Sequence, residues 1–145
     1  MSYHPMTDQE VRTFLTALPA HTGKLATVRQ DGRPHVAPIW YDVDDEGAVI
    51  FNTGERTVKG RNLIRDGRAA LCVDDERPPF SFVTIEGTVE IIRDLIEVRR
   101  WAVRIGGRYM GAARAEEYGA RNGVEGELVI RLRPRAVHSA ADLAD

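Results

Sequence analysis

The spacing of apolar residues changes along the chain, and each change marks a predicted element. Near the N-terminus, the capping box Thr7-Asp8-Gln9-Glu10 precedes four apolar residues at helical spacing. Pro19 follows them and cannot continue a helix, because it lacks a backbone N–H group. This pattern predicts a helix over residues 7–18.

From residue 24 to residue 93, apolar residues recur at every second position, which is typical of strands. Five strands are predicted here, at residues 25–29, 35–43, 48–53, 69–73 and 80–92. An Asp31-Gly32 turn joins the first two into a hairpin, and a short helix is predicted over residues 57–66. Gly87 interrupts the longest strand and predicts a bulge or a close backbone approach there.

Helical spacing returns over residues 94–122. A long helix is predicted from Leu95 with Gly106-Gly107 as its stop, and a second short helix over residues 113–121. A sixth strand follows within residues 126–137, and the final residues are expected to form a frayed tail. Six antiparallel strands with short peripheral helices predict a mainly β fold, a small barrel in one domain over residues 1–145.

Composition limits what such a domain can do. The 145 residues are 43% hydrophobic, enough for one core, and 20 basic residues against 22 acidic ones leave a net charge of −2. A nearly neutral chain offers no general attraction for nucleic acid or for an anionic membrane. The N-terminus lacks the pattern of a secretory signal, and no apolar run approaches the roughly 18 residues that span a bilayer. A cytoplasmic location is therefore expected.

The sequence does not support several kinds of catalytic or metal site. The single cysteine, Cys72, lies in an apolar strand, where a buried and inert thiol is expected. The four histidines are scattered, so no metal site is predicted. The glycines at 106–111 follow a helix rather than a strand, unlike a phosphate-binding fingerprint. No side chain is assigned a catalytic role, and the candidate proton donors are His35, Tyr41, Tyr109 and solvent.

The most informative segment is residues 52–65, where a strand ends, the chain turns at a glycine and a helix begins near Thr57. The start of a helix carries unpaired N–H groups and a positive dipole end, which suit an anion. Lys59, one of only two lysines, lies in the first helical turn, where a cation is unfavourable without an anion to meet it. Arg56 and Arg61 flank it. The segment predicts either a phosphate or polycarboxylate site, or a solvated basic helix face.

A series of short motifs follows in order between residues 24 and 89. They are Leu25-Ala26-Thr27-Val28, Asp31-Gly32-Arg33-Pro34, Val36-Ala37-Pro38-Ile39-Trp40-Tyr41, Thr57-x-Lys59-x-Arg61-Asn62-Leu63, Arg65-Asp66-x-Arg68-Ala69 and Glu86-Gly87-Thr88-Val89. This series resembles the pyridoxamine 5′-phosphate oxidase-like split β-barrel superfamily. Within that superfamily it is most similar to the flavin/deazaflavin oxidoreductases that use coenzyme F420.

The resemblance implies a six-stranded antiparallel split β-barrel and a homodimer with two cofactor sites between the subunits. It implies that the cofactor ring lies against one strand, made of His35, Val36, Ala37, Pro38, Ile39 and Trp40. The phosphate-bearing tail would meet the residues around the helix start, namely Asn52, Thr53, Arg56, Thr57, Val58, Lys59 and Arg61. The second subunit would close the groove with Phe80, Tyr109 and Met110. The implied reaction is hydride transfer between F420 and a small organic substrate.

Three other interpretations are open at the level of sequence. The same fold with FMN would use the same helix start for one phosphate. A non-enzymatic relative would store the cofactor or bind haem, with His35 or His138 as the axial ligand. An interaction module would leave the groove empty. Trp101 is expected either at a dimer interface or against its own barrel.

Overall fold

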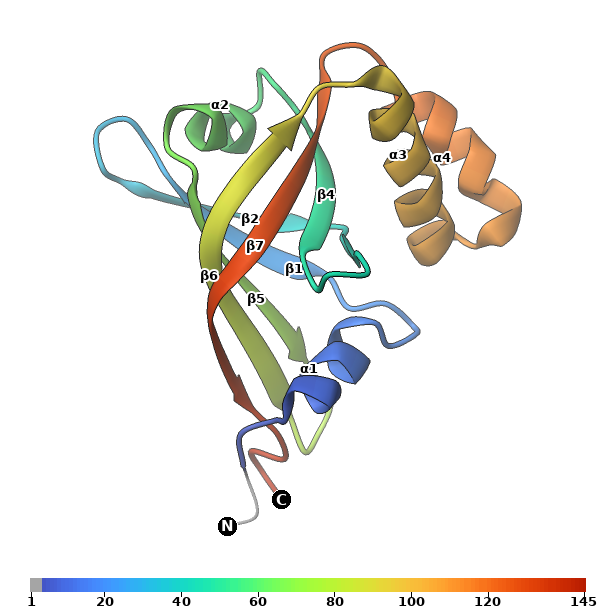
Figure 1. Ribbon diagram of the computed structural model, residues 1–145. Coiled ribbons are helices and arrows are strands. Elements are labelled where there is room, and N and C mark those ends of the chain that lie inside the picture. Colours follow the sequence, from blue (N-terminus) through green and yellow to red (C-terminus); the bar gives the residue numbers. More distant parts are fainter. Residues whose placement is uncertain (1–3) are drawn as a thin grey trace.

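The computed structural model describes residues 4–145. They form one antiparallel sheet of seven strands that curls strongly, with helices around its edges (Figure 1). The strands are β1 (Gly23–Val28), β2 (Pro34–Ile39), β3 (Asp42–Val43), β4 (Val49–Gly54), β5 (Arg68–Asp75), β6 (Ser81–Ile92) and β7 (Glu127–Ala140). The helices are α1 (Asp8–Leu15), α2 (Val58–Arg65), α3 (Leu95–Met110) and α4 (Ala115–Asn122), with a 3-10 turn, η1 (Ala112–Arg114), before α4. The predicted mainly β, split-barrel fold is confirmed.

The strand order is β2-β1-β5-β6-β7-β4-β3, so β2 and β3 lie at opposite edges of the sheet. The prediction of a single strand over residues 35–43 was therefore wrong. Its first part pairs with β1, its last part pairs with β4, and the chain crosses between the two edges at Trp40-Tyr41. Ile39, Tyr41 and Val43 are buried and alternate with less buried residues, so the two-residue spacing typical of a strand continues through the crossing. The sheet consequently has seven strands rather than six.

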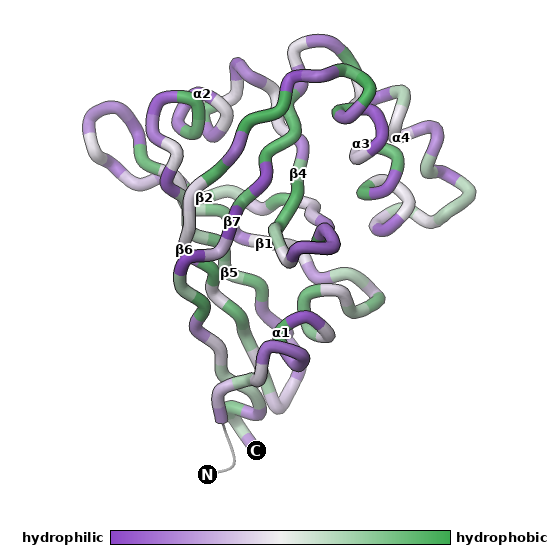
Figure 2. Tube along the Cα trace, in the orientation of Figure 1, coloured by the Kyte–Doolittle hydropathy of each residue, from purple (hydrophilic) through white to green (hydrophobic). Residues whose placement is uncertain are grey.

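The main core fills the inside of the curled sheet. Its largest fully buried side chains include Tyr41 of the crossing between β2 and β3, and Phe51, Leu71, Ile85 and Ile130 of four different strands. Hydropathy along the chain follows this arrangement, with hydrophobic stretches on the central strands and hydrophilic residues at the tip of the β1–β2 hairpin (Figure 2). Burial of these side chains provides the main stabilisation of the fold.

A second, smaller core lies between α3 and the adjoining strands. It contains Trp101 and Ile105 of α3, packed against Ile50 of β4 and Val129 of β7. Trp101 is only 2% exposed. Of the two positions expected for this indole, the structure supports packing against its own barrel.

The prediction that the long helix ends at Gly106-Gly107 was wrong, because α3 continues to Met110. These two glycines instead allow α4 to approach closely. A Cβ atom on Gly106 would overlap the Cβ atom of Tyr118, and one on Gly107 would lie 3.1 Å from the Cβ atom of Ala115. The helix ends at Gly111, whose φ of 97° is one that glycine adopts without steric cost.

Strand β7 is longer than predicted. It continues to Ala140, where a frayed tail was expected, because its last residues pair with β6 as far as Phe82. The predicted irregularity at Gly87 is confirmed, since the β6–β7 register shifts between Glu86 and Gly87 and a side chain at Gly87 would overlap the carbonyl of Arg133. Cys72 is half-buried rather than buried, because it alternates with the buried residues on either side of it in β5.

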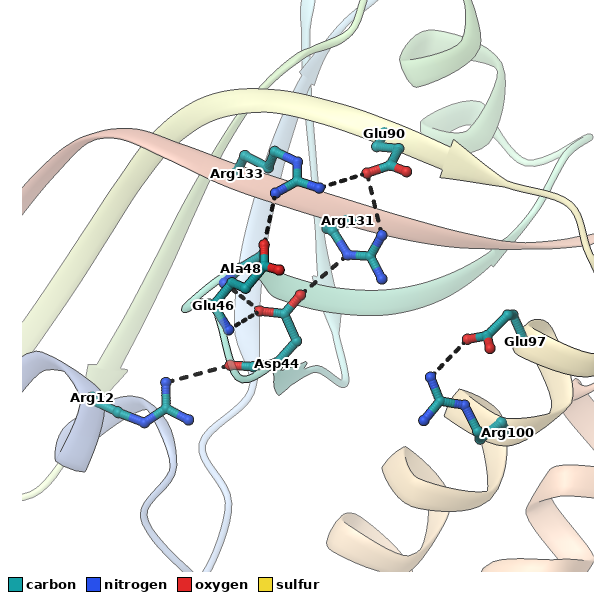
Figure 3. Close-up of polar contacts among 9 residues, drawn as sticks. All are labelled: Arg12, Asp44, Glu46, Ala48, Glu90, Glu97, Arg100, Arg131 and Arg133. Carbon is teal, nitrogen blue, oxygen red and sulfur yellow. Dashed lines mark hydrogen bonds and ion pairs between the residues drawn. The ribbon is translucent and has the colours of Figure 1, made fainter.

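The turn that leads into β4 is fixed by a network of ion pairs and hydrogen bonds (Figure 3). Asp44 accepts hydrogen bonds from the backbone N–H groups of Glu46 and Ala48, and its other carboxylate oxygen lies 3.2 Å from Arg131 of β7. Glu90 of β6 joins Arg131 to Arg133 at 3.2 and 3.0 Å. The network ties three segments of the sheet together on its surface.

Within residues 4–145, no helix is long and apolar enough to cross a membrane.

Candidate cofactor-binding site

The start of α2 is built by two threonines. The hydroxyl of Thr57 accepts a hydrogen bond from the backbone N–H of Gly60 at 3.0 Å and donates one to the carbonyl of Gly54 at 2.8 Å. Thr53 lies 3.0 Å from the same hydroxyl. The N–H groups of Val58 and Lys59, at the first helical positions, have no intrahelical acceptor, and such groups are suited to bind an anion.

Helix α2 is held against the sheet by Asn62, which is 4% exposed. Its side-chain amide donates a hydrogen bond to the Thr27 hydroxyl of β1 at 3.0 Å. Arg65 also donates to the carbonyl of Val28. These contacts fix the direction in which the first turn of α2 faces. His35 of β2 pairs with Thr27 in register, so it lies on the part of the sheet that α2 adjoins.

The cations around the start of α2 form no ion pair among the described residues, although Glu127 of the adjoining groove lies within the field of Lys59. Most basic residues elsewhere pair with a carboxylate, as Arg68 does with Asp66 at 2.7 Å. In contrast, Arg56, Lys59 and Arg61 have no ion pair within 4.0 Å among the residues that the structure describes. The clustering of these cations at a helix start favours the phosphate or polycarboxylate interpretation over a merely solvated face.

A small cavity of about 270 Å³ opens beside this helix start. Five of the residues predicted from the sequence line it: Pro38 and Ile39 at the end of β2, Trp40 just after it, Asn52 of β4, and Lys59 of α2. The structure therefore brings together parts of both predicted groups, the strand expected against the ring and the helix start expected at the phosphate. The Asn52 side chain is oriented by hydrogen bonds to the carbonyls of Val98 and Leu128, at 3.3 and 3.4 Å.

The remaining wall of the cavity comes from residues that the sequence did not single out. They are Ala102, Ile105 and Gly106 of α3 and Asn122 of α4. Ala102 and Ile105 belong to the apolar stripe of α3, which indicates burial rather than a cavity, and Gly106 was predicted only as part of a helix stop. Asn122 had no signal at all, because its position depends on how α4 packs on α3.

A wider groove of about 680 Å³ lies next to the turn that enters α2. Arg56 and Thr57 line it on one side, and residues 124–127 line it on the other. Glu127 is the unexpected member of this wall. Its burial raises the pKa of its carboxyl group, and the nearby charge of Lys59 lowers it to a smaller extent.

Trp40 and Tyr109 form an aromatic wall within the same chain. Their rings are stacked, with centroids 5.1 Å apart. The hydroxyl of Tyr109 donates a hydrogen bond to the carbonyl of His21 at 2.6 Å and accepts one from the backbone N–H of Tyr41 at 3.2 Å. Tyr109 thus holds parts of its own chain together, and Met110 follows it at the end of α3.

The candidate proton donors differ in burial and in hydrogen bonding. Tyr41 is fully buried, donates its hydroxyl to the carbonyl of Leu15 at 2.7 Å, and has a strongly raised pKa because of burial. Burial also raises the pKa of Tyr109, whose hydroxyl is already engaged. His35 is different, since its Nδ1 atom is buried and has no hydrogen-bond partner among the described residues. This leaves His35 and solvent as the candidate proton sources.

Phe80 does not join the other predicted residues within one chain. It lies in the turn between β5 and β6, which is at the end of the sheet near the termini, whereas α2 is at the other end (Figure 1). Its side chain is 39% exposed. A role for Phe80 at the site of a second subunit stays a prediction.

The outer face of the sheet carries a broad, largely apolar groove of about 660 Å³ that the sequence did not predict. It is lined mainly by β1, β5 and β6, with Ala26, Val28 and Ala70 among the lining residues, and Ala136 of β7 also contributes. Val36, on the adjoining edge strand, is 68% exposed. Exposed apolar residues gathered on a sheet face are typical of an interaction surface.

Comparison with known proteins identifies the family. The sequence profile of the pyridoxamine 5′-phosphate oxidase family matches residues 7–140, which is most of the chain. The chain therefore belongs to this family.

Two curated relatives share part of the chain. A 5a,11a-dehydrotetracycline/5a,11a-dehydrooxytetracycline reductase of Streptomyces rimosus subsp. rimosus is 37% identical over 95 residues, which cover 61% of this chain and 65% of the reductase. A pyridoxine/pyridoxamine 5′-phosphate oxidase of Mesorhizobium japonicum is 33% identical over 88 residues, covering 61% of this chain and 42% of the oxidase. The matches span less than two thirds of either relative, and both relatives are oxidoreductases.

Solved structures agree on the fold. The conserved hypothetical protein Rv2991 from Mycobacterium tuberculosis superimposes with a TM-score of 0.79 at 27% identity, covering 92% of this chain and 84% of that one. A structure described as an F420 reductase gives a TM-score of 0.64 at 27% identity, covering 81% of this chain and 88% of the reductase. A haem storage protein, HutZ from Vibrio cholerae, has a TM-score of 0.69 at 18% identity and covers 90% of this chain and 92% of that one, which shows the shared fold alone.

Proposed function

We propose that this protein is an oxidoreductase that uses coenzyme F420 to reduce a small, unsaturated organic molecule. The observation that carries the proposal is the helix start at Lys59. It presents a lysine that has no ion pair among residues 4–145, and N–H groups without an intrahelical acceptor, beside a cavity whose other walls come from β2, β4, α3 and α4. A negatively charged tail at Lys59 would place an attached ring along β2.

The choice of F420 rests on the extent of the basic surface. FMN carries one phosphate, whereas F420 carries a phosphodiester followed by a chain of glutamates. Arg56 and Arg61 are exposed on either side of Lys59 and have no ion pair among residues 4–145. They provide more positive charge than a single phosphate needs. The likeness to an F420 reductase supports the same choice.

When bound and reduced, F420 supplies the hydride, and the protein binds the cofactor, orients it and excludes water. The name of the Streptomyces relative, a dehydrotetracycline reductase, gives a precedent for an unsaturated organic substrate. Within the site, Trp40 and Tyr109 provide a rigid wall beside the ring. The proton that accompanies hydride transfer is supplied by His35 or by solvent.

A homodimer is part of the proposal. The cavity beside Lys59 is much smaller than the outer apolar groove, and neither encloses a large tricyclic cofactor within one chain. A second copy packed on the outer face of β1, β5 and β6 would cover that apolar groove. It would also bring its own Phe80 turn toward the first subunit.

The FMN-dependent alternative is favoured by one observation, the relationship to a pyridoxine/pyridoxamine 5′-phosphate oxidase. A fluorescence titration of the purified protein with F420 and, in parallel, with FMN separates the two. Tight F420 binding with weak FMN binding supports the proposal, and the reverse preference overturns it in favour of a flavin enzyme. A Soret band after addition of haem, with no binding of either coenzyme, would instead indicate a haem protein that uses His35 or His138.

A further inference from the structure

Glu127 occupies a position that an anion-binding site does not require. It begins β7 and pairs with Gly54, the residue at which β4 ends and the turn into α2 begins. A Cβ atom on Gly54 would lie 3.5 Å from Oε2 of Glu127. The Glu127 carboxylate therefore lies beside Gly54, next to the turn that forms the helix start.

This carboxylate has no partner that would explain its position. Its Oε2 atom is buried and receives no hydrogen bond from the described residues. The charged groups around it are Lys59 and Arg56 beside α2, Glu125 in the preceding turn, and the pair formed by Glu55 and Arg93, whose closest atoms are 2.8 Å apart. Lys59 is too far away for an ion pair within 4.0 Å and acts on Glu127 only through its field. A buried carboxylate oxygen without a donor is costly, so a functional reason is expected.

A bound phosphate would change the charge balance around Glu127. Lys59 would then be neutralised by the phosphate, and an ionised Glu127 would face a second negative group in a partly buried site. Of these groups, the carboxylate is the one that readily takes up a proton, and burial already favours its neutral form. As a neutral acid, Glu127 becomes a hydrogen-bond donor to a phosphate oxygen.

We propose that Glu127 couples the binding of the cofactor's phosphate to the uptake of one proton from solvent onto its carboxyl group. This inference rests on the proposed function, because it concerns the same cofactor site. It makes Glu127 a specificity-determining residue, because the affinity for an anionic tail is highest at pH values at which the Glu127 carboxyl group is neutral. It also explains a carboxylate among the cations of α2, since the acid sets the pH range in which the site holds its ligand.

The test is a set of F420 titrations from about pH 5 to about pH 8 with the wild type, Glu127→Gln and Glu116→Gln. Glutamine keeps the shape of the neutral acid but cannot ionise, and Glu116 is an exposed control on α4. Coupling to one proton weakens wild-type binding by up to about tenfold per pH unit once the carboxyl group ionises. The ratio of wild-type to Glu127→Gln dissociation constants should therefore rise with pH, because the ligand's own titration cancels in the ratio. For Glu116→Gln the ratio should stay near one.

The outcomes separate the inference from the proposed function. If F420 binds neither protein at any pH, the proposed function fails and the inference fails with it. If F420 binds but the ratio does not change with pH, the coupling is overturned and the proposed function stands. Weaker binding by Glu127→Gln at every pH would also overturn the coupling, because Glu127 would then be an acceptor for a ligand hydroxyl group.

A second measurement does not depend on how the variant folds. Carbon-13 NMR of the wild type, with labelled glutamate side chains, follows the Glu127 carboxyl group directly. Saturating F420 should raise the pKa of Glu127, and Lys59→Met should raise it in the free protein. An unchanged titration of Glu127 on adding F420 would overturn the inference even if the dissociation constants varied with pH.

Discussion

The ring of Tyr109 lies parallel to the indole of Trp40, with 5.1 Å between centroids and 5° between planes. Trp40 stands at the crossing between the two edges of the sheet, and Tyr109 is at the last turn of α3. The stack therefore joins the place where the chain changes edges to the helical hairpin that covers the candidate site. The Tyr109 hydroxyl strengthens this connection through His21 and Tyr41.

We expect Tyr109→Phe to destabilise the protein by about 1–3 kcal/mol, because it leaves two buried backbone groups without a partner but keeps the ring stack. Tyr109→Leu removes the stack as well and should cost more. Urea unfolding of both variants, followed by tryptophan fluorescence and circular dichroism, measures the difference. Equal stability of Tyr109→Phe and the wild type would contradict a structural role for the hydroxyl.

Gly106→Ala should lower the free energy of unfolding by about 1–3 kcal/mol, because the new methyl group overlaps Tyr118 and forces α4 away from α3. The matched control is Gly67→Ala, whose methyl group would have its nearest neighbours, atoms of Val89, at 3.9 Å. Urea denaturation compares the two substitutions. Similar effects at both positions would mean that close helix packing is not the reason for Gly106.

Lys59→Ala should weaken F420 binding by about tenfold to a hundredfold, the usual worth of a hydrogen bond to a charged group. Lys24, the only other lysine, pairs with Asp74 at 2.7 Å and lies outside the site, so Lys24→Ala is the control. Fluorescence titration gives both dissociation constants. Unchanged affinity in the Lys59 variant would remove the phosphate-anchor role while leaving the fold assignment intact.

The acid sensitivity of the fold should depend partly on Asp66. Hydrogen bonds from Arg68 lower the pKa of Asp66 from 3.8 to about 2. The unfolded chain, with the ordinary pKa, therefore binds more protons than the folded chain in this range, so this contribution to stability is present above about pH 4 and lost toward pH 2. Asp66→Asn should show a smaller loss of stability over that range than the wild type does. The exposed Asp45→Asn is the control, and equal acid dependence in all three proteins would contradict the assignment.

Most of the sheet could be predicted from the sequence because strands β1, β4, β5 and β6 each place one apolar face on a common core. The helix start at Thr57 was also visible, since capping and charge are local properties. Pro38, Asn52 and Lys59 meet in one cavity, as the resemblance to the family implied. The structure shows this meeting in a single chain, and their contact with a cofactor stays a prediction.

Features that depend on packing between distant segments could not be predicted in this way. The pair Gly106-Gly107 has the local signature of a helix end, but contact with α4 decides its role. Glu127 looks like an ordinary polar residue at a strand start, and only the pairing of β7 with β4 places it opposite Gly54. Trp101, too, has the same helical spacing whether it faces its own barrel or a partner.

The position of β7 in the sheet has a consequence for biosynthesis. Strand β4 bonds to the rest of the sheet only through β7, apart from its pairing with the two-residue strand β3. Strands β1, β2, β5 and β6 can pair with one another without β7, whereas β4 has only the short strand β3 as a partner until β7 is in place. We therefore expect the candidate site to be completed late in folding, once residues 127–132 have been synthesised and have paired with β4.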